Sequence, residues 1–163
     1  MALFQAFAGL DSASKRAIQC AMSFFTEKLG DVKLVNLIKP MLLDLSELVT
    51  PKYISNQVIK YAATAKAPKV LQEACNHLRD TIDNFGGAGV PLKETIDYAK
   101  LAAAHATPAV RQAAIGLFCG LYKHVGDAIR SFMNDIKDST LKLIDQELDK
   151  TTQYKKGEFE KKR

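Results

Sequence analysis

Two stretches of sequence, forty residues apart, decide the fold: "PKVLQEACNHLRDTIDNFG" (68–86) and "PAVRQAAIGLFCGLYKHVG" (108–126). Both begin with proline and end with glycine, and in both the apolar residues recur at intervals of three and four. This spacing predicts an amphipathic helix. Proline fits the first turn of such a helix, and glycine fits the position just after its last turn.

The register between the two stretches extends into the residues that precede them. At the same offset Val58 aligns with Tyr98, and Ala62 aligns with Ala102. A period of about 40 residues that contains two helices is typical of HEAT repeats, whose helix pairs stack into a solenoid. Strand patterns are nearly absent. The sequence therefore predicts an all-α fold, an α-solenoid of about four HEAT-like helix pairs.

The expected helix bounds follow from the periodicity and from the proline and glycine positions. The four expected pairs are 14–29 with 32–49, 51–65 with 68–85, 91–105 with 108–125, and 127–136 with 139–150. Thr50 and Thr107 each precede a proline at a helix start, so their hydroxyls are expected to cap these helices. We expect the solenoid over residues 1–150 and a basic flexible tail over residues 151–163.

The net charge of +5 lies mostly in the tail. Residues 150–163 contain six Lys or Arg and two Glu, a charge of +4, which leaves +1 for the other 149 residues. Such a distribution does not indicate a nucleic-acid-binding domain. The tail is either a solvated linker or an electrostatic arm for an acidic partner.

Neither a membrane span nor a secretory signal is predicted. No apolar run approaches the roughly 18 residues that a span needs, and residues 1–10 lack the basic start of a signal peptide. The cysteines, Cys20, Cys75 and Cys119, are odd in number and form no CxxC motif. This usage favours buried thiols in a reducing compartment. The protein is therefore expected to be cytoplasmic and to have no membrane partner.

The motifs that carry enzyme chemistry are absent from the sequence. "FGGAGVPLKET" (85–95) lacks the spacing of a phosphate-binding loop and is expected to be a helix end followed by an inter-repeat turn. The histidines share no metal-like spacing with one another or with a cysteine. Cys75 and His77 lie two residues apart, on different faces of one helix. We expect no catalytic site, no metal site and no cofactor.

The turns inside the helix pairs carry the candidate binding residues. Because the pairs stack, these turns are expected to lie along one edge of the solenoid, where they form a natural binding surface. Each turn brings at least one cation to that edge, which suits a large acidic partner. Solvated charges at helix ends are the alternative interpretation. The cations are Lys33, Lys66, Lys69 and Arg111.

Four segments resemble a known family: "EKLGDVK" (27–33), "AKAPKVLQEACNHL" (65–78), "DNFGGAGVPLK" (83–93) and "TPAVRQAAIGLFCGLYKHVG" (107–126). They are similar to the second half of a TOG domain from the ch-TOG and mini spindles microtubule polymerases. The resemblance covers roughly residues 17–150. A full TOG domain is longer than four helix pairs, so the chain is expected to correspond to its C-terminal part.

The resemblance implies a flat HEAT paddle whose intra-repeat loops bind αβ-tubulin or the microtubule lattice, in proteins of the spindle and centrosome. By position, the loops would contribute Lys33, then Lys66 and Lys69, then Thr107 and Arg111. The protein would then be a tubulin-binding module that regulates microtubule assembly, and not an enzyme. The alternative is a structural or adaptor HEAT module that binds a non-tubulin spindle or centrosome protein.

Overall fold

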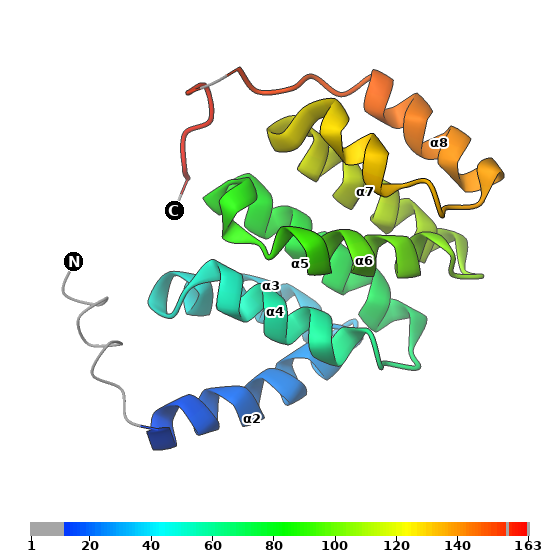
Figure 1. Ribbon diagram of the computed structural model, residues 1–163. Helices are drawn as coiled ribbons and strands as arrows, with labels where there is room; N and C mark the ends of the chain where they lie inside the picture. The colour runs from blue at the N-terminus through cyan, green and yellow to red at the C-terminus, as the bar shows by residue number, and fades with distance from the viewer. Residues whose placement is uncertain (1–11, 156, 163) are drawn as a thin grey trace.

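The computed structural model describes residues 12–155 and 157–162, and within them the ordered elements are all helical (Figure 1). The α-helices are α2 (Ser12–Lys28), α3 (Val35–Leu48), α4 (Pro51–Ala62), α5 (Pro68–Phe85), α6 (Leu92–Ala103), α7 (Pro108–Val125) and α8 (Asp138–Asp149). Two 3-10 helices, η1 (Gly87–Gly89) and η2 (Gly126–Phe132), follow α5 and α7.

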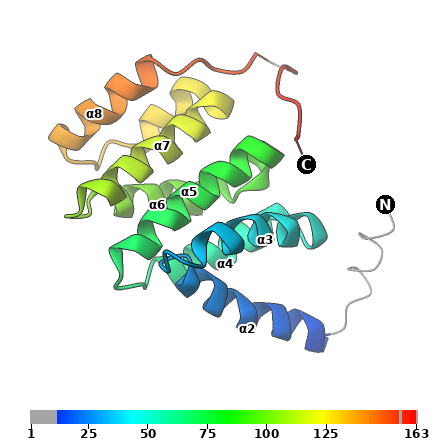
Figure 2. The ribbon, with the colours of Figure 1, turned by 180° about the vertical axis from the view of Figure 1, so that it is seen from behind.

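The helices pack as antiparallel pairs in two layers. α4 and α6 face the viewer in Figure 1, whereas α3, α5 and α7 face the viewer in Figure 2. α5 and α7 make the most extensive contact between any two of the described elements. Leu78 on α5 and Phe118 on α7, which are forty residues apart, are both fully buried. The predicted all-α solenoid of HEAT-like pairs is confirmed.

Local sequence signals set most of the helix ends as predicted. Proline is the first residue of α4, α5 and α7, and Pro91 lies one residue before α6. Gly86 and Gly126 follow α5 and α7 with φ values of 83° and 62°. Positive φ is a conformation that glycine adopts without strain, so both glycines stop their helices as expected.

The start of α3 differs from the prediction. The helix begins at Val35 rather than at residue 32. Asp31 shapes a turn there, because its side chain accepts a hydrogen bond from the N–H of Lys33 at 2.8 Å. Such local side-chain bonds compete with helix formation.

The predicted helix over residues 127–136 is wrong. The chain forms η2 and then an irregular segment in its place. Within residues 127–136 only Ile129 and Met133 are buried. Local side-chain bonds accompany the tighter winding: the hydroxyl of Ser131 donates to the carbonyl oxygen of Ala128 at 2.7 Å, and such bonds compete with the α-helical hydrogen-bond pattern. The first helix of the fourth pair is therefore replaced by a tighter 3-10 segment.

Of the two predicted caps, one is confirmed and one is wrong. The hydroxyl of Thr50 accepts a hydrogen bond from the N–H of Tyr53 at 3.2 Å, at the start of α4. The side chain of Thr107 makes no such bond at the start of α7. Instead, the N–H of Thr107 donates to Nδ1 of His105 at 3.0 Å, and the imidazole takes part in the turn.

The two threonines give a matched test of capping. Thr50→Ala is expected to lower the free energy of unfolding by about 1 kcal/mol, because the first turn of α4 loses its hydroxyl acceptor. Thr107→Ala removes no cap and is expected to change the free energy by less than about 0.5 kcal/mol. Urea unfolding followed by far-UV circular dichroism measures both. Equal effects of the two substitutions would contradict the capping assignment.

The cysteines differ in their surroundings. All three are free thiols. Cys75 is buried, and burial raises the pKa of its thiol to about 12, whereas Cys119 is half-buried. Cys20 is exposed, which corrects the expectation of three buried thiols. α2 buries Met22, and a residue two positions away on a helix points to a different face.

The structure also bears on the membrane and signal-peptide expectations. None of the described helices combines the length and the apolar character of a membrane span. Residues 1–10, which the sequence pattern does not identify as a signal peptide, lie outside the described residues.

Candidate functional site

The turns inside the first three helix pairs lie along one edge of the solenoid. They connect α2 to α3, α4 to α5 and α6 to α7. This edge is at the right of Figure 1 and at the left of Figure 2. We call it the ridge and define it as residues 29–34, 63–70 and 104–111. The five predicted site residues all lie within the ridge.

Neighbouring parts of the ridge are in close contact. A Cβ atom at Gly30 would lie 2.7 Å from Cγ2 of Val70, so the absence of a side chain lets the first turn approach α5. Leu29, next to Gly30, is fully buried. These contacts place the turn that carries Lys33 beside the helix that carries Lys69.

Lys33 and Lys66 are exposed, whereas the other three site residues are half-buried. Within the part of the chain that the structure describes, neither the Lys33 nor the Lys66 side chain forms an ion pair. Lys66 also borders a recess of about 380 Å³, whose walls include Glu27, Tyr61 and Thr64. Lys33 and Lys66 are therefore the exposed and uncompensated charges among the site residues.

Lys69 forms an ion pair within its own helix. Its Nζ lies 2.7 Å from a carboxylate oxygen of Glu73, whose side chain is 9% exposed. Burial raises the pKa of Glu73, but hydrogen bonds from Lys69 and Asn76 outweigh burial and hold this pKa below its usual value. Lys69 therefore presents less uncompensated charge at the ridge than Lys66 does.

Arg111 stabilises the turn between α6 and α7. Its Nη1 donates hydrogen bonds to the carbonyl oxygens of His105 at 2.9 Å and of Ala106 at 2.6 Å. These carbonyls follow the last turn of α6, where backbone acceptors lack helical partners and a cation is favourable. Thr107 is half-buried in the same turn. Arg111 and Thr107 lie at the ridge as predicted, but the guanidinium is already engaged within the turn.

One residue behind the ridge was not apparent from the sequence. Lys39 of α3 pairs with Asp80 of α5 at 2.9 Å and lies 4.0 Å from Glu73. It connects the first two helix pairs just below the turns that carry Lys33 and Lys66. The only sequence signal was a lysine on the helix predicted over residues 32–49, which does not identify a partner 41 residues away.

A fourth turn extends the same edge. Residues 133–137 precede α8, and they lie on the same side as the ridge in Figures 1 and 2. Asp135 in this turn pairs with Lys100 at the end of α6, at 2.8 Å, and Lys137 is exposed. Sequence reasoning did not include this turn among the candidate binding turns, although the predicted pair 127–136 and 139–150 also has its inner turn here.

The three histidines take part in the packing and hydrogen bonding of the fold. His77 is fully buried, His105 bonds the ridge turn, and His124 packs against the rings of Tyr154 and Phe159. Among the described residues, no group of three His, Cys, Asp or Glu side chains could hold a metal ion.

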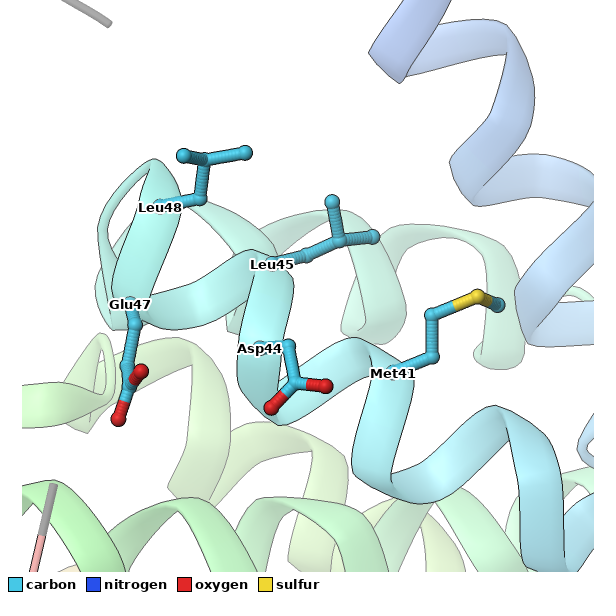
Figure 3. Close-up of a pocket in the computed structure, with 5 residues that line it drawn as sticks. All are labelled: Met41, Asp44, Leu45, Glu47 and Leu48. Atoms are coloured by element: carbon cyan, nitrogen blue, oxygen red, sulfur yellow. The ribbon is translucent and has the colours of Figure 1, made fainter. Parts of the chain in front are cut away.

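A separate hollow lies on α3, away from the ridge (Figure 3). Met41, Leu45 and Leu48 lie along one face of the helix, and Asp44 and Glu47 lie beside them. The hollow has a volume of about 270 Å³. The three apolar side chains are spaced by four and three residues, as on one face of a helix, so this hollow is an apolar helix face rather than a site with convergent polar groups.

Comparison with known families identifies the fold. The family model described as the TOG domain of XMAP215, Dis1 and CLASP proteins matches residues 10–148. The chain belongs to this TOG-domain family. The resemblance seen in the ridge turns and in the repeated helices is therefore confirmed, and the chain is a TOG-type module of a family of microtubule-associated proteins.

Curated relatives contain this TOG domain within much longer chains. Centrosomal protein 224 of Dictyostelium discoideum is 30% identical over 145 residues, which is 84% of this chain. Protein MOR1 of Arabidopsis thaliana is 31% identical over 147 residues, which is 90% of this chain. Each match spans 7% of the relative's own length.

Solved TOG structures show the same solenoid. Mini spindles TOG3 of Drosophila melanogaster superposes with a TM-score of 0.83 at 25% identity, over 91% of this chain and 64% of that one. The N-terminal domain of MAST/Orbit superposes with a TM-score of 0.70 at 25% identity, over 77% of this chain and 59% of that one. The TOG domain described here therefore matches a large part of each solved domain.

Proposed function

We propose that this TOG domain binds αβ-tubulin or the microtubule lattice through the ridge, as a module that regulates microtubule assembly and has no catalytic role of its own. The supporting observation is the pair Lys33 and Lys66, which are exposed, form no ion pair among the described residues, and lie on adjacent turns at one edge. Cations arranged in this way attract a large acidic partner and fix its register on the surface.

The five ridge residues divide into two roles in this proposal. Lys33 and Lys66 contact acidic groups of the partner directly, because their charges are free. Lys69 adds a partly compensated charge beside them, since its ammonium group forms an ion pair with the carboxylate of Glu73. Arg111 and Thr107 hold and line the third turn, so that its backbone faces the same partner.

The proposed location follows from the proposed partner. We place the protein in the cytoplasm, on the microtubule cytoskeleton of the spindle and centrosome. The name of the relative Centrosomal protein 224 assigns that protein to the centrosome, which agrees with the proposal. We propose neither a nucleic acid nor a membrane as a partner, since the charge of residues 1–149 is only +1 out of a total of +5.

The double charge reversal Lys33→Glu/Lys66→Glu tests the ridge. We expect it to weaken the binding of αβ-tubulin by about tenfold or more, since two attractive contacts become repulsive. Size-exclusion chromatography and co-sedimentation at low ionic strength measure the affinity, because added salt screens exposed charges. Lys69 and Arg111 are left unchanged, because replacing them would also disturb the helix and the turn that they stabilise.

The matched control is Lys93→Glu/Lys142→Glu, which reverses two exposed lysines outside the ridge. It changes the net charge equally and is expected to leave the affinity within about twofold of the wild type. Equal losses in both variants would mean that net charge, and not the ridge, governs binding. If the wild-type chain does not bind tubulin at all, the domain is instead an adaptor module for a non-tubulin spindle or centrosome protein.

A further inference from the structure

The residues that follow α8 run back along the edge opposite the ridge. Figure 1 shows them leaving α8 and passing the ends of α7 and α5 at the left. The N–H of Tyr154 donates to the carbonyl oxygen of Lys123 at 2.8 Å, and the N–H of Lys162 donates to the carbonyl oxygen of Asn84 at 3.0 Å. One segment is thus hydrogen-bonded to the C-terminal ends of two helices from different repeats.

An aromatic cluster lies between these two hydrogen bonds. The ring of Phe159 lies 4.7 Å from the ring of His124 and 5.4 Å from the ring of Tyr154, between centroids. His124 and Tyr154 are 5.1 Å apart. Phe159 is half-buried, whereas the described residues on either side of it, Glu158 and Glu160, are exposed. Phe159 is therefore the apolar anchor of the segment.

The glycines that stop α5 and α7 also form the surface under this segment. A Cβ atom at Gly86 would lie 2.9 Å from Cε1 of Phe159. A Cβ atom at Gly126 would lie 2.7 Å from Oε1 of Gln153. The two positions that end helices in the forty-residue repeat therefore also let the segment lie directly against the helix ends.

The segment is held by aromatic packing and backbone hydrogen bonds rather than by charge. Its lysines Lys155, Lys161 and Lys162 form no ion pair with the solenoid within the described part of the chain. Ordering the backbone costs about 1–2 kcal/mol for each residue, whereas burial of a whole aromatic side chain contributes only about 1.5–3 kcal/mol. The half-buried ring and the two backbone hydrogen bonds therefore leave the docked segment with little net stability. A balance of this kind lets a modest competing interaction release the segment.

We propose that residues 151–155 and 157–162 form a releasable strap. Docked, the strap joins the ends of α5 and α7 through Phe159, against Gly86 and His124. Released, it is a basic arm that binds an extended acidic polypeptide. A free arm can follow the contour of such a chain, which a docked strap cannot, so acidic polypeptide binds the released state more tightly and shifts the population toward it.

Hydrogen exchange on the full chain, read by mass spectrometry, tests the docked state. In Phe159→Ala we expect the amides of Tyr154 and Lys162 to exchange at least tenfold faster than in the wild type, while the amides within α5 and α7 keep their protection. Glu160→Ala, an exposed neighbour on the same segment, is the matched control and is expected to exchange like the wild type. Equal exchange of the tail amides in Phe159→Ala and the wild type would overturn the proposal.

Poly-glutamate is the probe for the released state. We expect it to speed exchange of the tail amides in the wild type, and to bind Phe159→Ala, which has the same charge, at least threefold more tightly than the wild type. Identical affinities of these two proteins would overturn the coupling between release and acidic polypeptide. Neither readout involves tubulin or the ridge, so a failure here is distinct from a failure of the proposed tubulin binding.

Discussion

Replacing Phe118 with alanine is expected to lower the free energy of unfolding by about 3–5 kcal/mol. Phe118 is fully buried on α7, the helix that packs most extensively against α5. The substitution removes the apolar ring from the core and leaves a cavity that the surrounding helices fill only in part. Urea unfolding followed by circular dichroism measures the change, and a loss of this size is a large part of the stability of an ordinary domain.

Phe132→Ala is the matched control for this prediction. It removes the same side chain from η2, where the residue is 51% exposed, and is expected to change the free energy by no more than about 0.5 kcal/mol. If Phe118→Ala costs no more than Phe132→Ala, the contact between α5 and α7 is not the centre of the fold. Both helices begin at the ridge, so the same core also positions the second and third ridge turns.

The parts of the fold that could be predicted are those encoded by residues close together in sequence. Helical periodicity, proline at the first turn and glycine after the last one all act within a few residues. The alignment of Leu78 with Phe118 and of Gly86 with Gly126 therefore identified two equivalent helices, and the structure confirms both. The position of the ridge along one edge followed, because stacked helix pairs place their inner turns on the same side.

What could not be predicted depends on partners that lie far apart in sequence. Lys39 and Asp80, which form an ion pair at 2.9 Å, lie 41 residues apart, and the periodic pattern does not connect them. Residues 127–136 have apolar spacing like that of the other helices, yet they form a 3-10 helix and an irregular segment. Phe159 is a single aromatic residue in a charged tail, and nothing near it in sequence predicts contact with Gly86.

The location of the candidate site residues at the ridge was therefore predicted correctly, whereas their role in binding remains a prediction. Sequence reasoning treated its four cations as equivalent. The structure distinguishes Lys33 and Lys66, whose charges are free, from Lys69 and Arg111, whose charges have partners within the turns. This distinction decides which substitutions test binding and which would also alter the fold.

Acid is expected to destabilise the protein through His77. His77 is fully buried in the fold. Neither of its ring nitrogens has a hydrogen-bond partner among the described residues. Its pKa is lowered to about 4, mainly by burial; the charge of Asp80 opposes this shift and the charge of Lys39 adds to it. The fold thus favours the neutral imidazole, whereas the unfolded chain takes up a proton at its ordinary pKa of about 6.5.

Because the folded pKa lies below the unfolded one, this contribution to stability is complete above about pH 6.5 and is lost as the pH falls toward 4. We expect the free energy of unfolding to drop by about 2 kcal/mol between pH 7 and 5, and by about 3 kcal/mol at pH 4. The window between pH 6.5 and 5 isolates His77 from Glu73, whose lowered pKa affects stability only at lower pH. Urea unfolding at pH 7, 6 and 5 measures the drop.

His77→Met separates this effect from general acid sensitivity. Methionine fills a similar volume without a titrating group, so the variant is expected to keep its pH 7 stability at pH 5 and to remain within about 1.5 kcal/mol of the wild type at pH 7. Partial burial also lowers the pKa of His124, so His124→Gln measures its smaller share in the same direction. A wild-type drop that persists unchanged in His77→Met would show that another group governs the acid response.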